Sequence, residues 1–489
     1  MQPQIRRVGI GLLLAFLAVF AQLNYVQIFA AERIASNSAN VRALLREYSI
    51  KRGDIITADD RRIAVSRATR DNLKYQRTYP GGELYGHITG FYSIVYGTRA
   101  LERAYNDQLL GQGGVLSMQD IEDRFLGSGE QGDDIITTID SRLQETARAA
   151  LGDQRGSVVA LDPITGEVKA MWTNPSYDPS PLASHDPKEE RRYARTLHPR
   201  SPDTPMINGV TQRGYPPGST FKVVTAAAAL ENGYTPRSTF DDPVALELPQ
   251  TDQTLTNFTH TVCANGGRID LFTALEISSD TTFAMLGLRL HDEIRGVAEE
   301  MGFNREIPFD IGVEPSTFPD VPDDSKPLRA YAGIGQGDVV ATPLQMALVA
   351  ATIARGGEVP RPRLVSKIID ASGGLVDTFS PETIGNAMSS QTASELTEMM
   401  VAVVESGTGT NAQLPGVRIA GKTGTAQSAA GAAPHAWFIC FAPVADPQIA
   451  VAVVVENGGS LGAEATGGVV AAPIARTVLQ RAQEISDEW

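Results

Sequence analysis

The chain has 489 residues, which is enough for roughly two or three domains with a large hydrophobic core. Its formal net charge is −15 at pH 7, and this argues against nucleic acid as a partner, because a polyanion needs a basic surface. The 6 histidines are scattered, and the 2 cysteines, Cys263 and Cys440, lie far apart in sequence, so no metal-site spacing occurs. We therefore expect no metal and no cofactor.

A hydrophobic segment near the N-terminus follows two basic residues, Arg6 and Arg7. Residues 8–31 contain no charged side chain, and about 20 apolar residues are enough for a helix to cross a bilayer. The basic residues predict a cytoplasmic N-terminus and export of the rest, so residues 1–31 would be a cytoplasmic stub and a single membrane anchor. The alternative is a signal peptide cleaved within residues 18–21, although the uncharged run continues beyond that site. Both interpretations put the remaining chain outside the cytoplasm.

Residues 32–152 mix short apolar runs with turn signals and contain no catalytic combination of residues. The clearest predicted elements are a helix at residues 98–110 and a second helix at residues 140–151, which Asp140 would cap. We interpret this part as a smaller, mixed pedestal or interaction domain.

Residues 153–489 have the pattern of one larger domain. A β-hairpin is predicted at residues 157–172, followed by an irregular connection at residues 173–212. The elements predicted after it are an alanine-rich helix at 221–230, a polar and β-leaning segment at 240–263, helices at 269–290 and 344–354, strands at 417–427, 435–442 and 449–456, and an amphipathic helix at 469–485. Strands at both ends with helices between them predict an α+β domain, in which helices cover a mainly antiparallel sheet.

The alanine-rich helix begins at a turn, residues 213–218, that ends in two prolines and a glycine. Ser219 then lies at the helix N-terminus, and Lys222 follows three residues later, which predicts side chains on one face, about 5–6 Å apart at Cβ. A deprotonated amine can activate a hydroxyl as a nucleophile, and free backbone N–H groups at a helix start can stabilise an oxyanion. This pattern is weak by itself, because a capping serine followed by a solvated lysine looks the same.

Two further motifs follow in order: Ser278, Ser279 and Asp280, and then Lys422-Thr423-Gly424 with Thr425 next to it. Together with Ser219 and Lys222 they resemble the signature of penicillin-binding proteins and class A β-lactamases. With three motifs in the right order, chance becomes a minor explanation.

The chain is similar to class B penicillin-binding proteins, in particular to the penicillin-binding protein A type of actinobacteria. Beyond the motifs, the resemblance rests on residues 156–172, 333–345, 407–410 and 435–438. It implies a transpeptidase fold of the penicillin-binding and β-lactamase type at residues 153–489, preceded by the pedestal. It also implies a monofunctional D,D-transpeptidase that cross-links peptidoglycan in the cell wall and is acylated by β-lactams.

The resemblance implies roles for the reacting groups. Ser219 would attack the carbonyl of the penultimate D-Ala of a stem pentapeptide, the terminal D-Ala would leave, and a neighbouring stem's amine would resolve the acyl-enzyme. Lys222, neutral in the resting site, would take the Ser219 proton, and the charge of Lys422 would depress the pKa of Lys222. Ser278 would relay a proton between the lysines and the leaving amine.

The edge strand that carries Lys422, predicted at residues 417–427, is implied to bind substrate. Thr423 and Thr425 would hold the terminal carboxylate together with Lys422, and Gly424 would let the substrate backbone pass close to the strand. The backbone N–H groups of Ser219 and Thr425 would form the oxyanion hole. We interpret the glycines at 335 and 337 as a structural turn. His435 is interpreted as a capping or surface histidine, with a place in the cleft beside the strand as the alternative.

Asp280 departs from the family, which usually has Asn at this substrate-binding position. An ionised Asp only accepts hydrogen bonds, and a carboxylate beside Lys222 would favour the protonated amine. Three explanations remain open: compensation by Lys422, slower turnover, or a motif that is read one residue out of register.

Two alternative functions remain. A D,D-carboxypeptidase or β-lactamase could use the same nucleophile, although no general-base Glu for rapid deacylation is identified. A scaffold with weakened catalysis could instead recruit division or elongation proteins. The family also implies a lipid II polymerase of the SEDS type as a partner.

Overall fold

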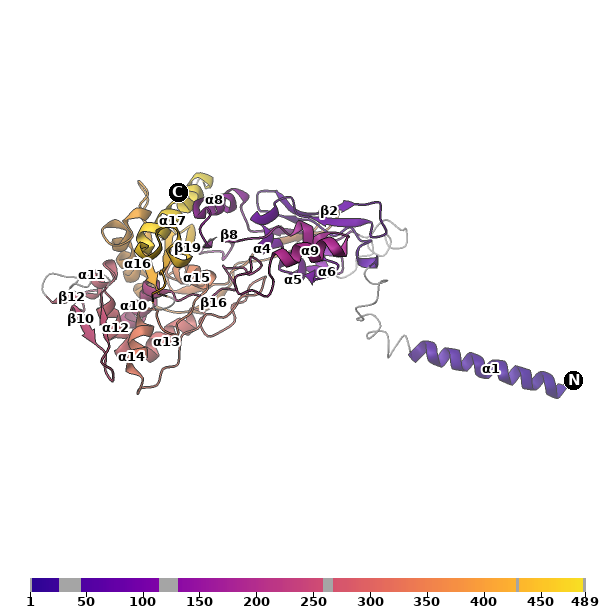
Figure 1. The fold of residues 1–489 in the computed structure, drawn as a ribbon, viewed down its shortest axis with the longest axis horizontal. Helices are drawn as coiled ribbons and strands as arrows, with labels where there is room; N and C mark the ends of the chain where they lie inside the picture. The colour runs from indigo at the N-terminus through magenta and orange to yellow at the C-terminus, as the bar shows by residue number, and fades with distance from the viewer. Residues whose placement is uncertain (1, 26–44, 114–130, 258–266, 428–430, 487–489) are drawn as a thin grey trace.

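The computed structural model describes residues 2–25, 45–113, 131–257, 267–427 and 431–486 (Figure 1). Near the N-terminus, α1 (Gln2–Asn24) is one continuous helix, and the side chains described in it are mostly exposed. Its segment Arg6–Asn24 has 19 residues and a mean hydropathy of 1.7, which is long and apolar enough to cross a membrane. Residues 26–31 of the predicted anchor lie outside the described residues.

The larger domain is built on a five-stranded sheet, with neighbouring strands in the order β17 (Ala420–Ala426), β18 (His435–Ala442), β19 (Ile449–Val455), β7 (Gly156–Leu161) and β8 (Val168–Asn174). All four pairings are antiparallel, which confirms the predicted sheet and hairpin. The strand with the Lys-Thr-Gly motif, β17, lies at one edge of the sheet.

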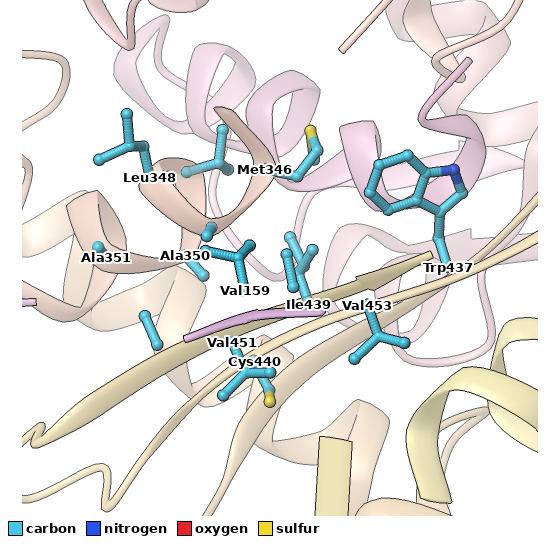
Figure 2. Close-up of a cluster of buried hydrophobic side chains, with 14 of the residues drawn as sticks. Val159, Met346, Leu348, Ala350, Ala351, Trp437, Ile439, Cys440, Val451 and Val453 are labelled. Atoms are coloured by element: carbon cyan, nitrogen blue, oxygen red, sulfur yellow. The ribbon is translucent and has the colours of Figure 1, made fainter. Parts of the chain in front are cut away.

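Helices cover both faces of this sheet. On one face lies α15 (Pro343–Ala354), and on the other lie α8 (Ser141–Leu151) and α17 (Ala472–Ile485). Figure 2 shows Val159 and Ile439 on the α15 side of the strands, with Met346 nearby, whereas Cys440 points to the opposite face. Because both faces are covered, β18 and β19 are buried at every position and have apolar runs instead of alternating patterns.

The helix that begins at the Ser219 turn has two parts. A 3-10 turn, η4 (Gly218–Phe221), leads directly into α10 (Lys222–Glu231), so the helix starts earlier than predicted. Four consecutive alanines of α10 are buried, and their small side chains let it pack closely against α12 (Asp280–Arg289), α13 (His291–Glu300) and α16 (Ser390–Glu405). Gly233 follows with a φ of +85°, consistent with the predicted stop.

The middle motif lies between two helices, α11 (Leu271–Glu276) and α12, as predicted. Ser278 forms the link with a φ of +65°, in the left-handed region that a non-glycine residue adopts at a cost of about 1–2 kcal/mol. The fold around it therefore holds a strained conformation at a motif residue.

The first module, described at residues 45–113 and 131–137, contributes to a six-stranded sheet in the order β15 (Leu375–Thr378), β14 (Val365–Ile369), β6 (Asp134–Thr137), β1 (Ile55–Ile56), β2 (Arg62–Ala68) and β3 (Tyr75–Thr78). Two of its strands come from residues after 360, whereas α8 packs on the sheet of the larger domain. Strand pairing thus joins residues after 360 to the first sheet, and helix packing places residues before 152 on the sheet of the larger domain.

Two local predictions were wrong. The helix predicted at residues 98–110 is broken into α5 (Leu101–Ala104) and α6 (Asn106–Leu109), because Tyr105 between them leaves the helical region at φ −113°. Residues 173–212, predicted to be irregular, include α9 (Pro187–Thr196). Asp186 caps α9 by accepting a hydrogen bond from the Lys188 N–H at 2.9 Å, a local signal that the polar composition obscured.

The remaining regular elements are short. They are α4 (Gly86–Thr89), β4 (Tyr92–Ser93), β5 (Gly97–Thr98), β9 (Thr239–Asp241), β10 (Ala245–Glu247), β11 (Thr254–Thr256), β12 (Arg268–Asp270), α14 (Lys326–Gly333), β13 (Glu358–Pro360) and β16 (Thr383–Asn386), together with 3-10 turns at Gly82–Leu84, Ser180–Ala183, Thr410–Ala412 and Glu456–Glu464 and a π turn at Gly467–Ala471.

Candidate active site

The turn that carries Ser219 packs directly against the edge strand β17. Gly218 has a φ of +55°, and a Cβ added there would lie 2.9 Å from the Ala426 Cβ and 3.0 Å from the Thr425 carbonyl oxygen. Only glycine fits this conformation and this approach. Ser219 itself is half-buried and precedes Lys222 by one 3-10 turn, in which residues three apart are aligned on one face.

Neighbouring groups fix this turn from two sides. The indole Nε1–H of Trp437 donates to the Pro216 carbonyl at 3.0 Å, so this fully buried aromatic residue also positions the turn. The Gly218 N–H donates to the Gly335 carbonyl at 2.9 Å. Gly335 has a φ of +70°, and a Cβ there would lie 2.3 Å from the Gly218 oxygen, which agrees with the predicted structural turn.

The two lysines of the motifs meet at Ser278. Lys222 Nζ donates to the Ser278 carbonyl oxygen at 2.8 Å and to its Oγ at 3.3 Å. Lys422 Nζ donates to the same Oγ at 2.9 Å and to the Thr423 carbonyl oxygen at 3.1 Å. Both lysine side chains are fully buried. The Ser278 hydroxyl therefore bridges the two amines.

The charges around the two lysines differ. Lys222 Nζ lies 2.7 Å from Asp280 Oδ1, and this ion pair favours the protonated amine. Lys422 has two neutral oxygens as hydrogen-bond acceptors, and burial, reinforced by the charge of Lys222, holds the pKa of Lys422 well below its usual range, while Asp280 opposes this shift. The like-charge effect thus acts on Lys422, and the effect that we predicted on the pKa of Lys222 stays a prediction.

The register of the middle motif follows from which side chains face the lysines. Ser278 and Asp280 contact them, whereas the Ser279 hydroxyl turns away and accepts from the Thr282 N–H at 3.3 Å as the cap of α12. The motif is therefore in the register that places Asp280 beside Lys222, and the one-residue shift is excluded.

Asn257, which sequence reasoning missed, supports this motif from outside it. Its side-chain oxygen accepts hydrogen bonds from the backbone N–H groups of Asp280 at 2.8 Å and Thr281 at 3.1 Å. The residue is only 2% exposed. It fixes the start of α12 and, with it, the Asp280 carboxylate. No sequence signal marks this asparagine, which lies in a polar stretch without a motif.

The residues of β17 after Lys422 have different surroundings. Thr423 is buried, and its hydroxyl lies 2.6 Å from that of Thr408, whereas Thr425 is half-buried and accepts a long hydrogen bond of 3.4 Å from the Gly467 N–H. A Cβ on Gly424 would lie 2.9 Å from the Pro217 carbonyl oxygen. Gly424 thus allows β17 to approach the Ser219 turn, and its predicted contact with substrate stays a prediction.

A second cluster that the motifs did not reveal connects the chain before Ser219 to the end of β19. The Tyr215 hydroxyl donates to Glu456 at 2.8 Å, and Arg155 pairs with the same carboxylate at 3.2 Å. His435 is 8% exposed, accepts from the Asn457 N–H at 3.1 Å, and has its pKa lowered by burial. The capping interpretation of His435 is confirmed, and it is not a surface residue.

No group of three or more His, Cys, Asp or Glu side chains is placed to hold a metal among the described residues. Cys440 is a free, buried thiol, and Cys263 lies outside the described residues.

The chain matches two known protein families. Residues 156–480 match the penicillin binding protein transpeptidase domain, and residues 52–135 match the penicillin binding protein A dimerisation domain. Among curated proteins, the chain is 39% identical to the peptidoglycan D,D-transpeptidase PbpA of Mycolicibacterium smegmatis and 37% identical to PbpA of Mycobacterium tuberculosis, in each case over 99% of both chains.

Solved structures agree with this similarity. The structure of penicillin-binding protein A from M. tuberculosis as a ceftriaxone acyl-enzyme complex matches with a TM-score of 0.86 and 38% identity, covering 90% of this chain and 100% of the other. The penicillin G acyl-enzyme complex of that protein matches with a TM-score of 0.83, also at 38% identity, covering 89% of this chain and 100% of the other.

Proposed function

The chain belongs to the penicillin-binding protein transpeptidases, and from that premise we propose that it cross-links peptidoglycan stem peptides through an acyl-enzyme on Ser219. Its activity is that of a serine-type peptidoglycan D,D-transpeptidase, which β-lactams acylate. The observation that carries the assignment of residues is the hydrogen-bonded contact of Lys222 and Lys422 through one hydroxyl, that of Ser278.

In the resting site, Lys222 carries the proton that its ion pair with Asp280 stabilises, and burial lowers the pKa of Lys422. The carboxylate of an arriving stem peptide places negative charge near Lys422 and favours protonation there. A proton then moves from Lys222 to the Ser278 hydroxyl, whose own proton passes to Lys422. Substrate binding thereby generates the neutral Lys222 that catalysis requires.

Neutral Lys222 takes the Ser219 proton while Oγ forms a bond to the carbonyl carbon of the penultimate D-Ala. The oxyanion of the tetrahedral intermediate is stabilised by the backbone N–H groups of Ser219 and Thr425. The Lys222 proton then passes through Ser278 to the leaving amine, the C–N bond breaks, and D-Ala departs. A neighbouring stem's amine attacks the ester by the reverse route and regenerates Ser219.

Substrate recognition is assigned to residues of β17. Lys422 with the hydroxyls of Thr423 and Thr425 binds the terminal carboxylate, and Gly424 leaves the strand free of a side chain where the peptide approaches. Asp280 accepts a hydrogen bond from the substrate amide in addition to its contact with Lys222. Its charge is balanced by Lys222, with which it forms an ion pair.

We place the protein in the cell membrane as a single-pass protein, with the first module and the transpeptidase domain outside the cytoplasm. The apolar segment Arg6–Asn24 and the basic residues Arg6 and Arg7 support this orientation. The first module is the part of the chain that would contact a SEDS-type lipid II polymerase or other division and elongation proteins.

The experiment incubates the purified full-length protein with a stem pentapeptide and an acceptor amine, and quantifies released D-Ala and the cross-linked product. Formation of both in the wild type and of neither in Ser219→Ala is the expected result. Release of D-Ala without cross-linked product would assign a D,D-carboxypeptidase. Turnover of penicillin G within minutes would assign a β-lactamase, and normal growth of cells that have only Ser219→Ala would favour the scaffold.

A further inference from the structure

A cavity of about 690 Å³ lies where the first module meets the transpeptidase domain. This volume is within the range typical of sites for small molecules. It is lined by residues of the first module, including Arg99 and Arg103, and by residues of the larger domain, including Thr211 and Gln212. None of the three motifs contributes to it, so it is separate from the Ser219 site.

Two arginines give this cavity its charge. Neither Arg99 nor Arg103 has an ion pair among the described residues, although the chain has fifteen more acidic than basic residues. Arg99 donates to the neutral Gln212 side chain at 3.2 Å, and Arg103 is exposed. Asp310 also lines the cavity, but its carboxylate accepts hydrogen bonds from the Tyr105 hydroxyl and the Leu364 N–H. The two guanidinium groups thus have no carboxylate partner among the described residues, and an anionic ligand could supply one.

The wall also contains buried polar atoms without partners. His87 Nε2 and Thr211 Oγ1 are buried and form no hydrogen bond among the described residues. Burial, reinforced by the charge of Arg99, lowers the pKa of His87 to about 3, so this ring is neutral at physiological pH. Buried polar groups without partners are uncommon in proteins and call for a ligand, an ion or a water molecule as an explanation.

Aromatic rings complete the lining. Phe91 and Tyr177 are buried and lie edge to face, with ring centroids 6.4 Å apart, and Tyr96 is 45% exposed. Rings beside amides and arginines suit a ligand that combines polar groups, apolar faces and negative charge.

We propose that this cavity binds a free carboxylate of a peptidoglycan stem peptide through Arg99 and Arg103, and so holds the polymer at a second point apart from Ser219. The proposal rests on the proposed function, because that function brings carboxylate-bearing peptides to the protein. A phosphate would satisfy the same arginines, but Asp310 in the same wall disfavours a ligand with more than one charge on a single group.

The test uses the full-length protein after acylation with penicillin G, which blocks Ser219. The probe is a disaccharide-tetrapeptide of peptidoglycan, and calorimetry compares it with the same molecule after conversion of all its carboxyl groups to carboxamides. The expected result is binding of the carboxylate form at least tenfold tighter than the carboxamide form. Arg99→Gln and Arg103→Gln should each weaken it about tenfold, and Arg103→Lys should restore part of the affinity.

The control is Arg192→Gln, since this arginine has a side chain that is 80% exposed and lies on α9 outside the cavity lining. Equal binding of the two forms, or binding that neither cavity arginine affects, would overturn the proposal. Tighter binding of inorganic pyrophosphate to the same arginines would overturn the assignment to a carboxylate. Acylation measured in the same samples shows that each variant is folded, and failure of the wild type to acylate would instead count against the proposed function.

Discussion

Lys222 Nζ and Asp280 Oδ1 are 2.7 Å apart, with the lysine side chain fully buried and that of the aspartate 19% exposed. The amine that is expected to act as a base, that of Lys222, thus forms an ion pair with a carboxylate. Asp280 is itself held by Asn257, which binds the backbone N–H of the aspartate at 2.8 Å. The ion pair is therefore part of a fixed arrangement, and in the proposed mechanism the protonation of Lys222 depends on Lys422 and on the substrate.

Replacing Asp280 by Asn is expected to raise acylation at neutral pH. The amide keeps an acceptor for Lys222 but removes the negative charge that favours its protonated form. The acidic limb of the pH profile for acylation by penicillin G should move by about 1 unit or more toward lower pH. Stopped-flow acylation rates measured from acidic to mildly alkaline pH test this shift. An unchanged acidic limb would contradict the role assigned to the Asp280 carboxylate.

Replacing Lys422 by Met is expected to change the pH dependence of stability. The pKa of Lys422 is lowered in the folded protein, so the unfolded chain binds more protons between that value and about 10.4, the pKa of a free lysine. Stability therefore rises with pH across this window in the wild type and is lower below it. Thermal unfolding of both proteins from neutral pH upward should show this rise in the wild type and a smaller one in Lys422→Met. If stability changed with pH in the same way in both proteins, the pKa of Lys422 would not be lowered in the folded state.

Replacing Gly218 by Ala is expected to reduce acylation at least tenfold, because the new methyl would collide with Ala426 and push the Ser219 turn away from β17. Gly233→Ala is the matched control: its φ of +85° also disfavours a side chain, but nothing lies within 4 Å of the added Cβ. Both variants should lose about 1–2 kcal/mol of stability from backbone strain. Equal acylation by the two variants would mean that the approach of β17 to the turn does not matter.

Replacing Asn257 by Ala is expected to cost about 1–3 kcal/mol of stability, since it leaves one buried and one partly buried backbone N–H group without an acceptor. Acylation should fall as well, because the start of α12 and Asp280 lose their fixed position. Asn232→Ala, which removes the side chain of an exposed residue bonded to the Ala228 carbonyl, is the control. Chemical denaturation and acylation rates measure the two effects, and an Asn257→Ala protein with wild-type acylation would remove Asn257 from the positioning role.

Replacing Trp437 by Phe removes one hydrogen bond, from the indole to the Pro216 carbonyl, and keeps an aromatic ring in the core. Acylation is expected to fall several-fold while the free energy of unfolding decreases by about 1 kcal/mol. Trp172→Phe is a suitable comparison, because the Trp172 Nε1 is buried without a hydrogen-bond partner in the described structure. If both variants acylate alike, the indole contact does not position the turn.

Much of the transpeptidase domain could be predicted from local patterns. The apolar strands, the caps and the glycine stops lie close to the residues that they affect, so β7, β8, β17 and α15 were found within a few positions of their observed ends. The three motifs likewise predicted that Lys222, Ser278, Asp280 and Lys422 meet, although not that the pKa of Lys422 would be lowered. That depends on burial, which the sequence does not report.

The missed features depend on contacts between distant parts of the chain. Strand β14 joins the first module from more than 200 residues away, and Tyr105 ends a predicted helix while its hydroxyl binds Asp310 of the larger domain. Asn257 and Glu456 are single polar residues whose partners are set only by the fold. No periodicity or spacing marks such positions.

The most direct test of the central claim, that the three motifs make Ser219 the acylated nucleophile, is intact-mass measurement after incubation with penicillin G, followed by peptide mapping. The expected result is a single adduct that maps to the peptide containing Ser219, persists for hours, and is absent from Ser219→Ala but present in the exposed-serine control Ser372→Ala. An adduct of the same mass on Ser219→Ala, or one that maps to another residue, would contradict the account.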